Sequence, residues 1–354
     1  MTSKLAYAEA IQAGGGDSQS LLAAGKRQHQ RRIAILAAAL VLLALAATVS
    51  IGLGPVRLGP VTVWRAILGR ATGLPQTIVW NIRLPRTLIG GLVGMALAIS
   101  GALLQGVMRN PLADPHIIGV SAGAGLGAVT VMTFFPLAAG YLVPVAAFGG
   151  ALVGAALVYA LAWRGGIAPM RMILAGVAVS SLFSAGTSAL LVTKSDNVQA
   201  AMTWLVGGLA GRGWTYWDRL WPYVTVGTIV ALVSARKVNL LLLGDDMAAG
   251  LGVRVERIRL LLIALAAMMA GAAVSVAGLI GFIGLIIPHI TRLLVGSDYR
   301  YLLPTAALLG SALLILADTA ARVVLDPVEL PVGILTAALG APFFLYLLRR
   351  RSGR

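Results

Sequence analysis

The sequence has no cysteine, only three histidines and few charged residues. Without cysteine the chain can form neither a disulfide nor a thiolate metal site. The histidines (His29, His116 and His289) are too scattered to suggest a metal cluster, so each is interpreted as structural and no metal site is expected. Charged residues make up 11% of the chain, whereas a soluble domain contains roughly 25%. This shortage of charge excludes an ordinary soluble protein.

What the chain has instead is apolar sequence, in segments mostly close to the length that crosses the hydrocarbon of a bilayer. We therefore predict an all-α polytopic membrane protein with about ten transmembrane helices. The predicted helices are 33–53, 87–108, 116–136, 143–163, 172–192, 220–234, 260–279, 281–295, 301–321 and 330–348. Residues 61–68 are too short to span and are predicted to form an interfacial helix, and the Gly- and Trp-rich segment 194–219 a surface helix plus loop.

The basic residues set the predicted orientation. Residues 1–32 are a polar N-terminal tail, expected to be loose over 1–25 and basic over 26–32. A signal peptide was the alternative, but the apolar run after it is long enough to span and no cleavage site follows. With the tail inside, 19 of the 28 basic residues lie on the inner side, so both termini are predicted to be cytoplasmic. The net charge of +16 is then interpreted as facing anionic lipid rather than nucleic acid.

One internal stretch, residues 236–259, does not belong inside a membrane. Asp245 and Asp246 follow Gly244, and Gly250 and Gly252 come shortly after them, between clusters of basic residues. Acids favour the first turn of a helix and glycine its end. We therefore predict a short surface helix over 245–251 in a cytoplasmic loop, although an ordinary solvated connector fits the same residues.

Four blocks resemble the permeases of type II ATP-binding-cassette importers, which carry iron–siderophore complexes, haem and cobalamin. They are R-L-P-R-T-L-I-G-G-L-V-G-M-A-L-A-I-S-G at 83–101, R-N-P-L-A-D-P-H-I-I-G-V-S-A-G-A at 109–124, G-L-I-G-F-I-G-L-I-I-P-H-I-T-R at 278–292 and E-L-P-V-G-I-L-T-A-A-L-G-A-P-F-F at 329–344. The blocks occur in family order over nearly the whole of 33–351. The resemblance implies a ten-helix permease domain over these residues.

The resemblance also implies the roles of particular residues. Segment 241–252 matches the family's coupling helix, which sits in a groove of the ATPase; its residues are Leu241, Gly244, Asp245, Met247, Ala248, Leu251 and Gly252. Asp246 departs from the apolar residue found in some relatives. Arg83, Arg86 and Arg322 match arginines that pair with acids of a periplasmic binding protein, with lipid anchoring as the alternative. Asp318 is expected to pair with Arg322 one turn later. The cytoplasmic gate falls at Ala168, Pro169 and Met170.

The partners and cargo follow from the resemblance in the same way. It implies that the chain pairs with a second copy of itself or with a close homologue, and we predict a second copy. It also implies two cytoplasmic ATPase subunits that use ATP and Mg, and a periplasmic binding protein. The assembly is predicted to lie in a bacterial inner membrane. The chain itself is expected to hold no cofactor and to catalyse no reaction. An iron chelate (siderophore or haem) is the predicted cargo, with cobalamin as the alternative. An ion-coupled secondary transporter needs buried acids, for which Asp318 is the one candidate, and a membrane enzyme needs a polar constellation that is not visible.

Overall fold

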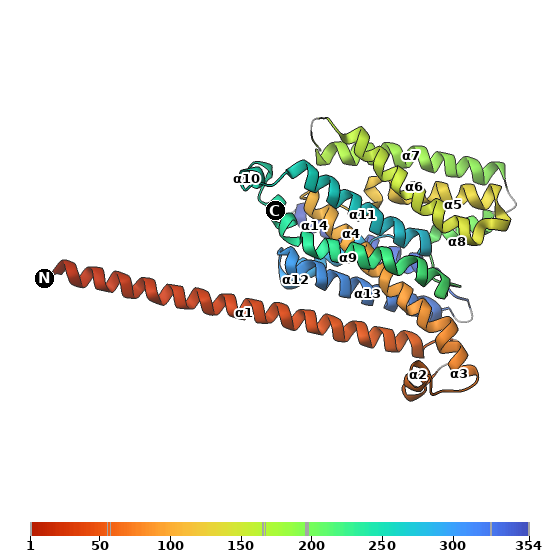
Figure 1. The fold of residues 1–354 in the computed structure, drawn as a ribbon, viewed down its shortest axis with the longest axis horizontal. Coiled ribbons are helices and arrows are strands. Elements are labelled where there is room, and N and C mark those ends of the chain that lie inside the picture. The colour runs from red at the N-terminus through yellow and green to blue at the C-terminus, as the bar shows by residue number, and fades with distance from the viewer. Residues whose placement is uncertain are drawn as a thin grey trace.

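The computed structural model describes residues 2–54, 56, 58–164, 166, 168–194, 198–325 and 328–352. The described part is built from helices (Figure 1). They are α1 (Thr2–Gly52), α2 (Pro60–Ile67), α3 (Leu74–Thr77), η1 (Ile78–Arg83), α4 (Leu84–Val107), η2 (Pro115–Ile118), α5 (Val120–Phe134), η3 (Pro136–Ala138), α6 (Ala139–Ala162), α7 (Pro169–Thr193), α8 (Val198–Val206), α9 (Trp214–Leu242), α10 (Asp245–Gly250), α11 (Val255–Ala277), α12 (Ile283–Val295), α13 (Tyr299–Val323) and α14 (Val332–Ser352).

Seven helical segments of the described chain are long and apolar enough to cross a membrane. They are Lys26–Gly52, Leu74–Val107, Pro136–Ala162, Pro169–Thr193, Trp214–Leu242, Val255–Ala277 and Tyr299–Val323. Three shorter apolar helices, Val120–Phe134, Ile283–Val295 and Val332–Leu345, fall at the other predicted crossings. The chain is therefore a multi-pass membrane protein, and ten as the number of crossings stays a prediction.

Helix α4 is the centre of the bundle. It packs against α9, α11, α12 and α13, and most of its side chains are buried. Helices α5, α6 and α7 form a second group beside it, at the top of Figure 1. Helix α10 and the C-terminal end lie at one end of the bundle, and α2 and α3 lie at the other. This arrangement separates an end that carries α10 from an end that carries the predicted outer arginines.

Glycines bring several of these helices into backbone contact. A Cβ atom added to Gly94 of α4 would collide with the carbonyl group of Gly310 in α13, and one added to Gly123 of α5 would collide with that of Gly150 in α6. In lipid, helices associate through close packing rather than through the hydrophobic effect, and small residues permit that approach. Close packing through glycine therefore accounts for these two crossings.

Three boundaries differ from the sequence prediction. Residues 2–25 were expected to be loose, but α1 begins at Thr2 and continues without a break to Gly52. Residues 194–219 were predicted to form a surface helix plus loop, but Trp214 and Trp217 belong to the first turns of α9. The crossing predicted over 116–136 starts later, because Gly119 in the left-handed conformation (φ 77°) separates η2 from α5.

Candidate functional site

The surface helix predicted between the transmembrane segments is present as α10, Asp245–Gly250. It is preceded by Gly244 and followed by Gly252, both with positive φ (109° and 81°), which a side chain rarely tolerates. Two backbone bonds close its end, from Gly252 N to Ala249 O at 2.9 Å and from Val253 N to Ala248 O at 3.0 Å. The glycines therefore set where this short helix starts and stops.

Asp245 fixes the first turn of α10 to two other parts of the bundle. Its carboxylate accepts hydrogen bonds from Arg259 Nη2 of α11 at 2.9 and 3.1 Å. It also pairs with Arg109, which follows α4 and donates its Nε to Leu241 O at 3.0 Å. Arg259 is itself buried and reaches Glu256 at 2.6 Å. The sequence alone does not identify Arg109 and Arg259 as partners of Asp245, because only the folded chain brings them next to it.

The predicted coupling residues divide into those that face inward and those that face out. Leu241 and Ala248 are buried, so they attach α10 to the bundle. Met247 and Leu251 are 62% and 60% exposed, and they are the large apolar side chains that α10 and its end present. Gly244 and Gly252 shape the turns on either side. The result is a short helix held by ion pairs, with an apolar surface free to meet another protein.

Arg86 lies at the opposite end of the bundle, in the first turn of α4. Its guanidinium donates Nε and Nη2 to the two oxygens of Asp318 in α13, both at 2.9 Å. A third bond, from Nη1 to Glu329 at 2.8 Å, reaches the segment before α14. Bidentate pairing of this kind is strong and directional. Arg86 therefore joins three segments that are far apart in the sequence.

Arg83 and Arg322 lie next to this ion pair and hold the end of α1. Arg83 donates to the carbonyl groups of Ile51, Gly52 and Val56, and Arg322 donates to Ser50 O at 3.0 Å. The predicted pairing of Arg322 with Asp318 is confirmed, at 3.4 Å.

The three arginines predicted to dock a binding protein are buried within the chain. Arg83, Arg86 and Arg322 are each less than one tenth exposed, because their charges are used by acids and carbonyl groups of the chain itself. A docking role for them stays a prediction, but contact with a binding protein would first require these side chains to leave their present partners.

The predicted gate residues lie at the start of α7. Ala168 precedes the helix, Pro169 occupies its first position and Met170 is 67% exposed. Their role as a gate remains a prediction.

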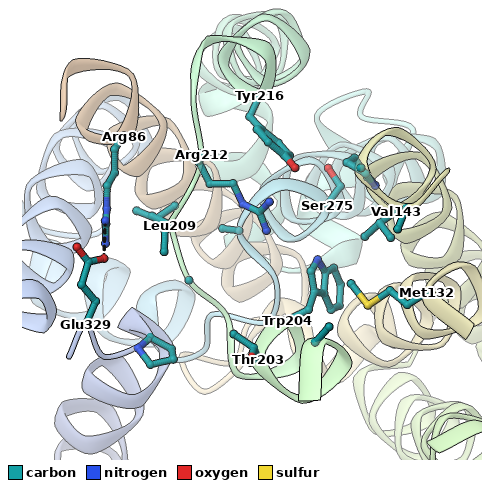
Figure 2. A pocket seen from close by; sticks show the side chains of 18 of the residues that line it. Arg86, Met132, Val143, Thr203, Trp204, Leu209, Arg212, Tyr216, Ser275 and Glu329 are labelled. Carbon is teal, nitrogen blue, oxygen red and sulfur yellow. Dashed lines mark hydrogen bonds and ion pairs between the residues drawn. The ribbon is translucent and has the colours of Figure 1, made fainter. Parts of the chain in front are cut away.

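A cavity of about 480 Å³, which we call the outer cavity, opens near Arg86 (Figure 2). Its walls come from α5, α6, α8, α9 and α11 and from residues 329–331. Polar side chains face it among apolar ones, including Thr203, Trp204, Arg212, Tyr216 and Ser275. The sequence analysis assigned the tryptophan-rich segment to the surface and gave no sign of this cavity.

His116 and Asp114 form a second polar feature that the sequence analysis interpreted as structural. His116 Nδ1 lies 2.6 Å from Asp114 Oδ1, and both residues line a cavity of about 290 Å³ with Phe282 and Phe344. Burial alone would lower the pKa of His116, but the adjacent carboxylate outweighs it and raises that pKa.

Comparison with known proteins agrees with this geometry. The family model described as the FecCD transport family matches residues 41–350. The chain belongs to this family. The cobalamin import system permease protein of Halobacterium salinarum is 51% identical over 286 residues, which are 80% of this chain and 77% of that protein.

Other family members of nearly the same length carry other names. The Fe(3+)-citrate import system permease protein of Bacillus subtilis is 41% identical and covers 92% of this chain and 97% of its own. The hemin transport system permease protein of Yersinia pestis is 41% identical and covers 93% and 99%. A solved structure described as an inward-facing conformation of a putative metal-chelate type ABC transporter superposes with a TM-score of 0.78 at 32% identity, over 89% of this chain and 99% of that one.

Proposed function

We propose that this FecCD-family chain is the membrane-spanning permease of an ATP-driven importer that moves a metal chelate into the cell. The observation that carries the proposal is α10: Asp245 is held by Arg109 and Arg259, while Met247 and Leu251 stay exposed. A short helix fixed in this way transmits a push to the bundle as a rigid-body movement. An ion-coupled carrier is less well supported, because the buried acid Asp318 is engaged by Arg86.

The cargo proposed first is an iron chelate, either a siderophore complex or haem. Relatives named for Fe(3+)-citrate and for hemin match at least 90% of this chain. Cobalamin is the second candidate, and the 51% identity to a permease named for cobalamin import favours it. The discriminating experiment is to identify the ligand of the cognate binding protein and then measure its ATP-dependent uptake in proteoliposomes. Uptake that proceeds without ATP would overturn the importer proposal.

The proposed assembly contains two copies of this chain, two ATPase subunits and a periplasmic binding protein, in a bacterial inner membrane. ATP and Mg would be used by the ATPase subunits, with no reaction catalysed and no cofactor held by this chain. We propose that Arg83, Arg86 and Arg322 fix the outer ends of α1, α4 and α13. These helix ends lie at the end of the bundle that a binding protein would meet.

The coupling role is tested by placing a charge on the exposed face of α10. Met247→Asp and Leu251→Asp leave the buried anchor Ala248 untouched, so insertion and folding of the chain should persist. Each is expected to lower ATP-driven uptake by about tenfold, because a charge at an apolar contact costs more than about 1.4 kcal/mol. Uptake and co-purification of the ATPase are measured together. Leu137→Asp, fully exposed between α5 and α6, is the matched control. Uptake by Met247→Asp equal to that by Leu137→Asp would contradict the assignment.

A further inference from the structure

The outer cavity contains hydrogen-bond donors that lack acceptors. Trp204 of α8 is 6% exposed, and its indole Nε1 is buried with no hydrogen-bond partner in the part of the chain that the structure describes. An indole N–H can only donate, and a buried donor without an acceptor costs stability. Figure 2 shows this ring at the edge of the cavity, turned toward Arg212.

Arg212 brings a positive charge to the same space. Its guanidinium lies over the ring of Tyr216, 4.5 Å from the ring centre, and its Nε is buried without a hydrogen-bond partner among the described residues. The described acids form no ion pair with it. Stacking on an aromatic ring holds a guanidinium in place and leaves its N–H edge available for a planar anion.

The remaining polar groups permit an anion here. Among the residues that the structure describes, Glu329 is the one acid that lines the cavity, and its carboxylate is bound by Arg86 at 2.8 Å. The hydroxyl groups of Tyr216 and Ser275 face the same space (Figure 2). A volume of about 480 Å³ lies within the range of roughly 300–1,000 Å³ that small-molecule sites occupy.

We propose that the outer cavity is a binding site for a carboxylate group of a small organic anion. Arg212 would bind the carboxylate through two N–H groups, and Trp204 would donate a third hydrogen bond from Nε1. The cavity is lined by residues of a single chain, so each copy of the permease would carry its own site.

The loop between Trp204 and Arg212 connects this site to two transmembrane helices. Gly208 N in this loop donates to Ala277 O at the end of α11 at 2.7 Å, and Gly333 N of α14 donates to Gly207 O at 3.1 Å. A bound carboxylate joining Trp204 and Arg212 would therefore stabilise the junction of α8, α11 and α14.

Two sources could supply the carboxylate. If the carboxylate belongs to a metal chelate, the cavity is a transient binding site for the cargo during transport, and this interpretation rests on the function proposed above. A metal-free carboxylate would make it an independent site. Citrate with and without Fe(III) serves as the probe for both sources.

The test measures binding of radiolabelled citrate to the full chain in lipid nanodiscs, with and without Fe(III). Arg212→Gln is expected to weaken binding by about tenfold or more, since a charged hydrogen-bond pair is lost, and Trp204→Phe by about threefold to tenfold. Arg212→Lys keeps the charge without the planar fork and should fall between wild type and Arg212→Gln. Arg70→Gln, exposed on the outer side near α2, should bind as wild type does.

The outcomes separate the alternatives. Binding that requires Fe(III) identifies the chelate as the source, and equal binding without Fe(III) identifies the free carboxylate. Absence of saturable binding to the folded wild-type chain, or equal binding by Arg212→Gln and Arg70→Gln, would overturn the proposal. The proposal would also be overturned if Arg212→Gln bound citrate as wild type does but associated more slowly with the binding protein. That result would identify the cavity as a protein-docking surface. ATP-dependent uptake is measured separately. Absence of saturable citrate binding to a wild-type chain that still supports ATP-dependent uptake would overturn this inference and leave the proposed function standing.

Discussion

Asp245 accepts hydrogen bonds from arginines on two different segments, and at the residue scale this carboxylate decides how firmly α10 is held. It is half exposed, so each ion pair contributes only about 0.2–1 kcal/mol to the stability of the whole chain. Its importance is therefore positional, because α10 has just six residues and cannot hold its place by burial.

Replacement of Asp245 by alanine should uncouple hydrolysis from transport. Without the carboxylate the first turn of α10 loses Arg109 and Arg259, so uptake is expected to fall while ATP hydrolysis continues. Both rates are measured in the same proteoliposomes. Asp246→Ala is the matched control, since this adjacent exposed acid has no ion pair within the described chain. An equal loss of uptake in the two variants would contradict the anchoring role.

Asp298 gives a pH-dependent prediction. Hydrogen bonds from Arg300, acting against burial and helped by Asn239, lower the pKa of Asp298 from 3.8 to about 2. Because the folded-state pKa is depressed, the ionised group stabilises the fold above pH ~4, and this contribution is lost as the pH falls toward 2. The side chain also caps α13 by accepting from Arg300 N.

Asp298→Ala should therefore lower the melting temperature at pH 7, where the lost cap alone costs about 0.5–2 kcal/mol. The difference from wild type should be constant between pH 7 and 5 and shrink below pH 4. Thermal unfolding in detergent across this range is the measurement. Asp218→Ala, on the exposed side of α9, should change little at any pH. A difference that grows on acidification would refute the assignment.

The contrast between Arg322 and Arg86 shows what the sequence could predict about single residues. Asp318 and Arg322 are one helical turn apart, so their pairing followed from spacing. Arg86 and Asp318 are 232 residues apart, and no local pattern connects them. For this reason the sequence did not show that Arg86 is buried. Anchoring in the lipid surface was the alternative considered for these arginines, but the fold supplies acids and carbonyl groups nearer to them.

At the scale of the elements, backbone contact with neighbouring helices leaves no room for a side chain at Gly94 and Gly101 of α4. Gly94→Val is expected to lower the free energy of unfolding by about 1–3 kcal/mol, since the side chain would overlap the carbonyl group of Gly310. Thermal unfolding of the purified chain measures the loss. Gly149→Ala in α6, where no atom lies within 4 Å of the new Cβ, is the control and should stabilise by up to about 1 kcal/mol. Equal melting temperatures for the two variants would exclude backbone packing as the cause.

The helices were easier to predict than their ends. Apolar length identifies a membrane helix regardless of its neighbours, so every predicted crossing corresponds to a helix of the structure. The boundaries depended on other information. Trp214 was assigned to a surface helix plus loop because tryptophan is enriched at the membrane–water interface. Helix α9 nevertheless begins at Trp214, since a transmembrane helix can place its own tryptophans at that interface. The predicted α10 ended within one residue of the observed helix, because glycines set its limits.

At the scale of the whole molecule, the spans of α1 and α7 are the two least covered by the rest of the described chain, with 17% of the apolar stretch buried in each. On α7, Met170, Leu174, Val177 and Leu182 are all more than half exposed. We predict that the face of α7 packs against the second copy and that α1 faces lipid. Because the sequence contains no cysteine, any disulfide formed by a single introduced cysteine comes from that position alone.

Val177→Cys or Leu174→Cys is therefore expected to give disulfide-linked dimers in native membranes under mild oxidation. Leu45→Cys, on the exposed side of α1, is the control and should remain monomeric on a denaturing gel. Mass measurement of the extracted complex should show two copies with two ATPase chains. Cross-linking through Leu45→Cys and not through α7 would place the interface on the opposite side.

The ion pair between Arg86 and Asp318 also has a consequence for synthesis. A ribosome adds roughly 5–20 residues per second, so the 232 residues between them take roughly 12–46 s to make. During that time α4 would hold a guanidinium at the predicted outer face of the bilayer before its carboxylate partner has been made. Nascent chains arrested before residue 318 should therefore be the forms that membrane quality-control proteases remove fastest, and release beyond Glu329 should end that vulnerability.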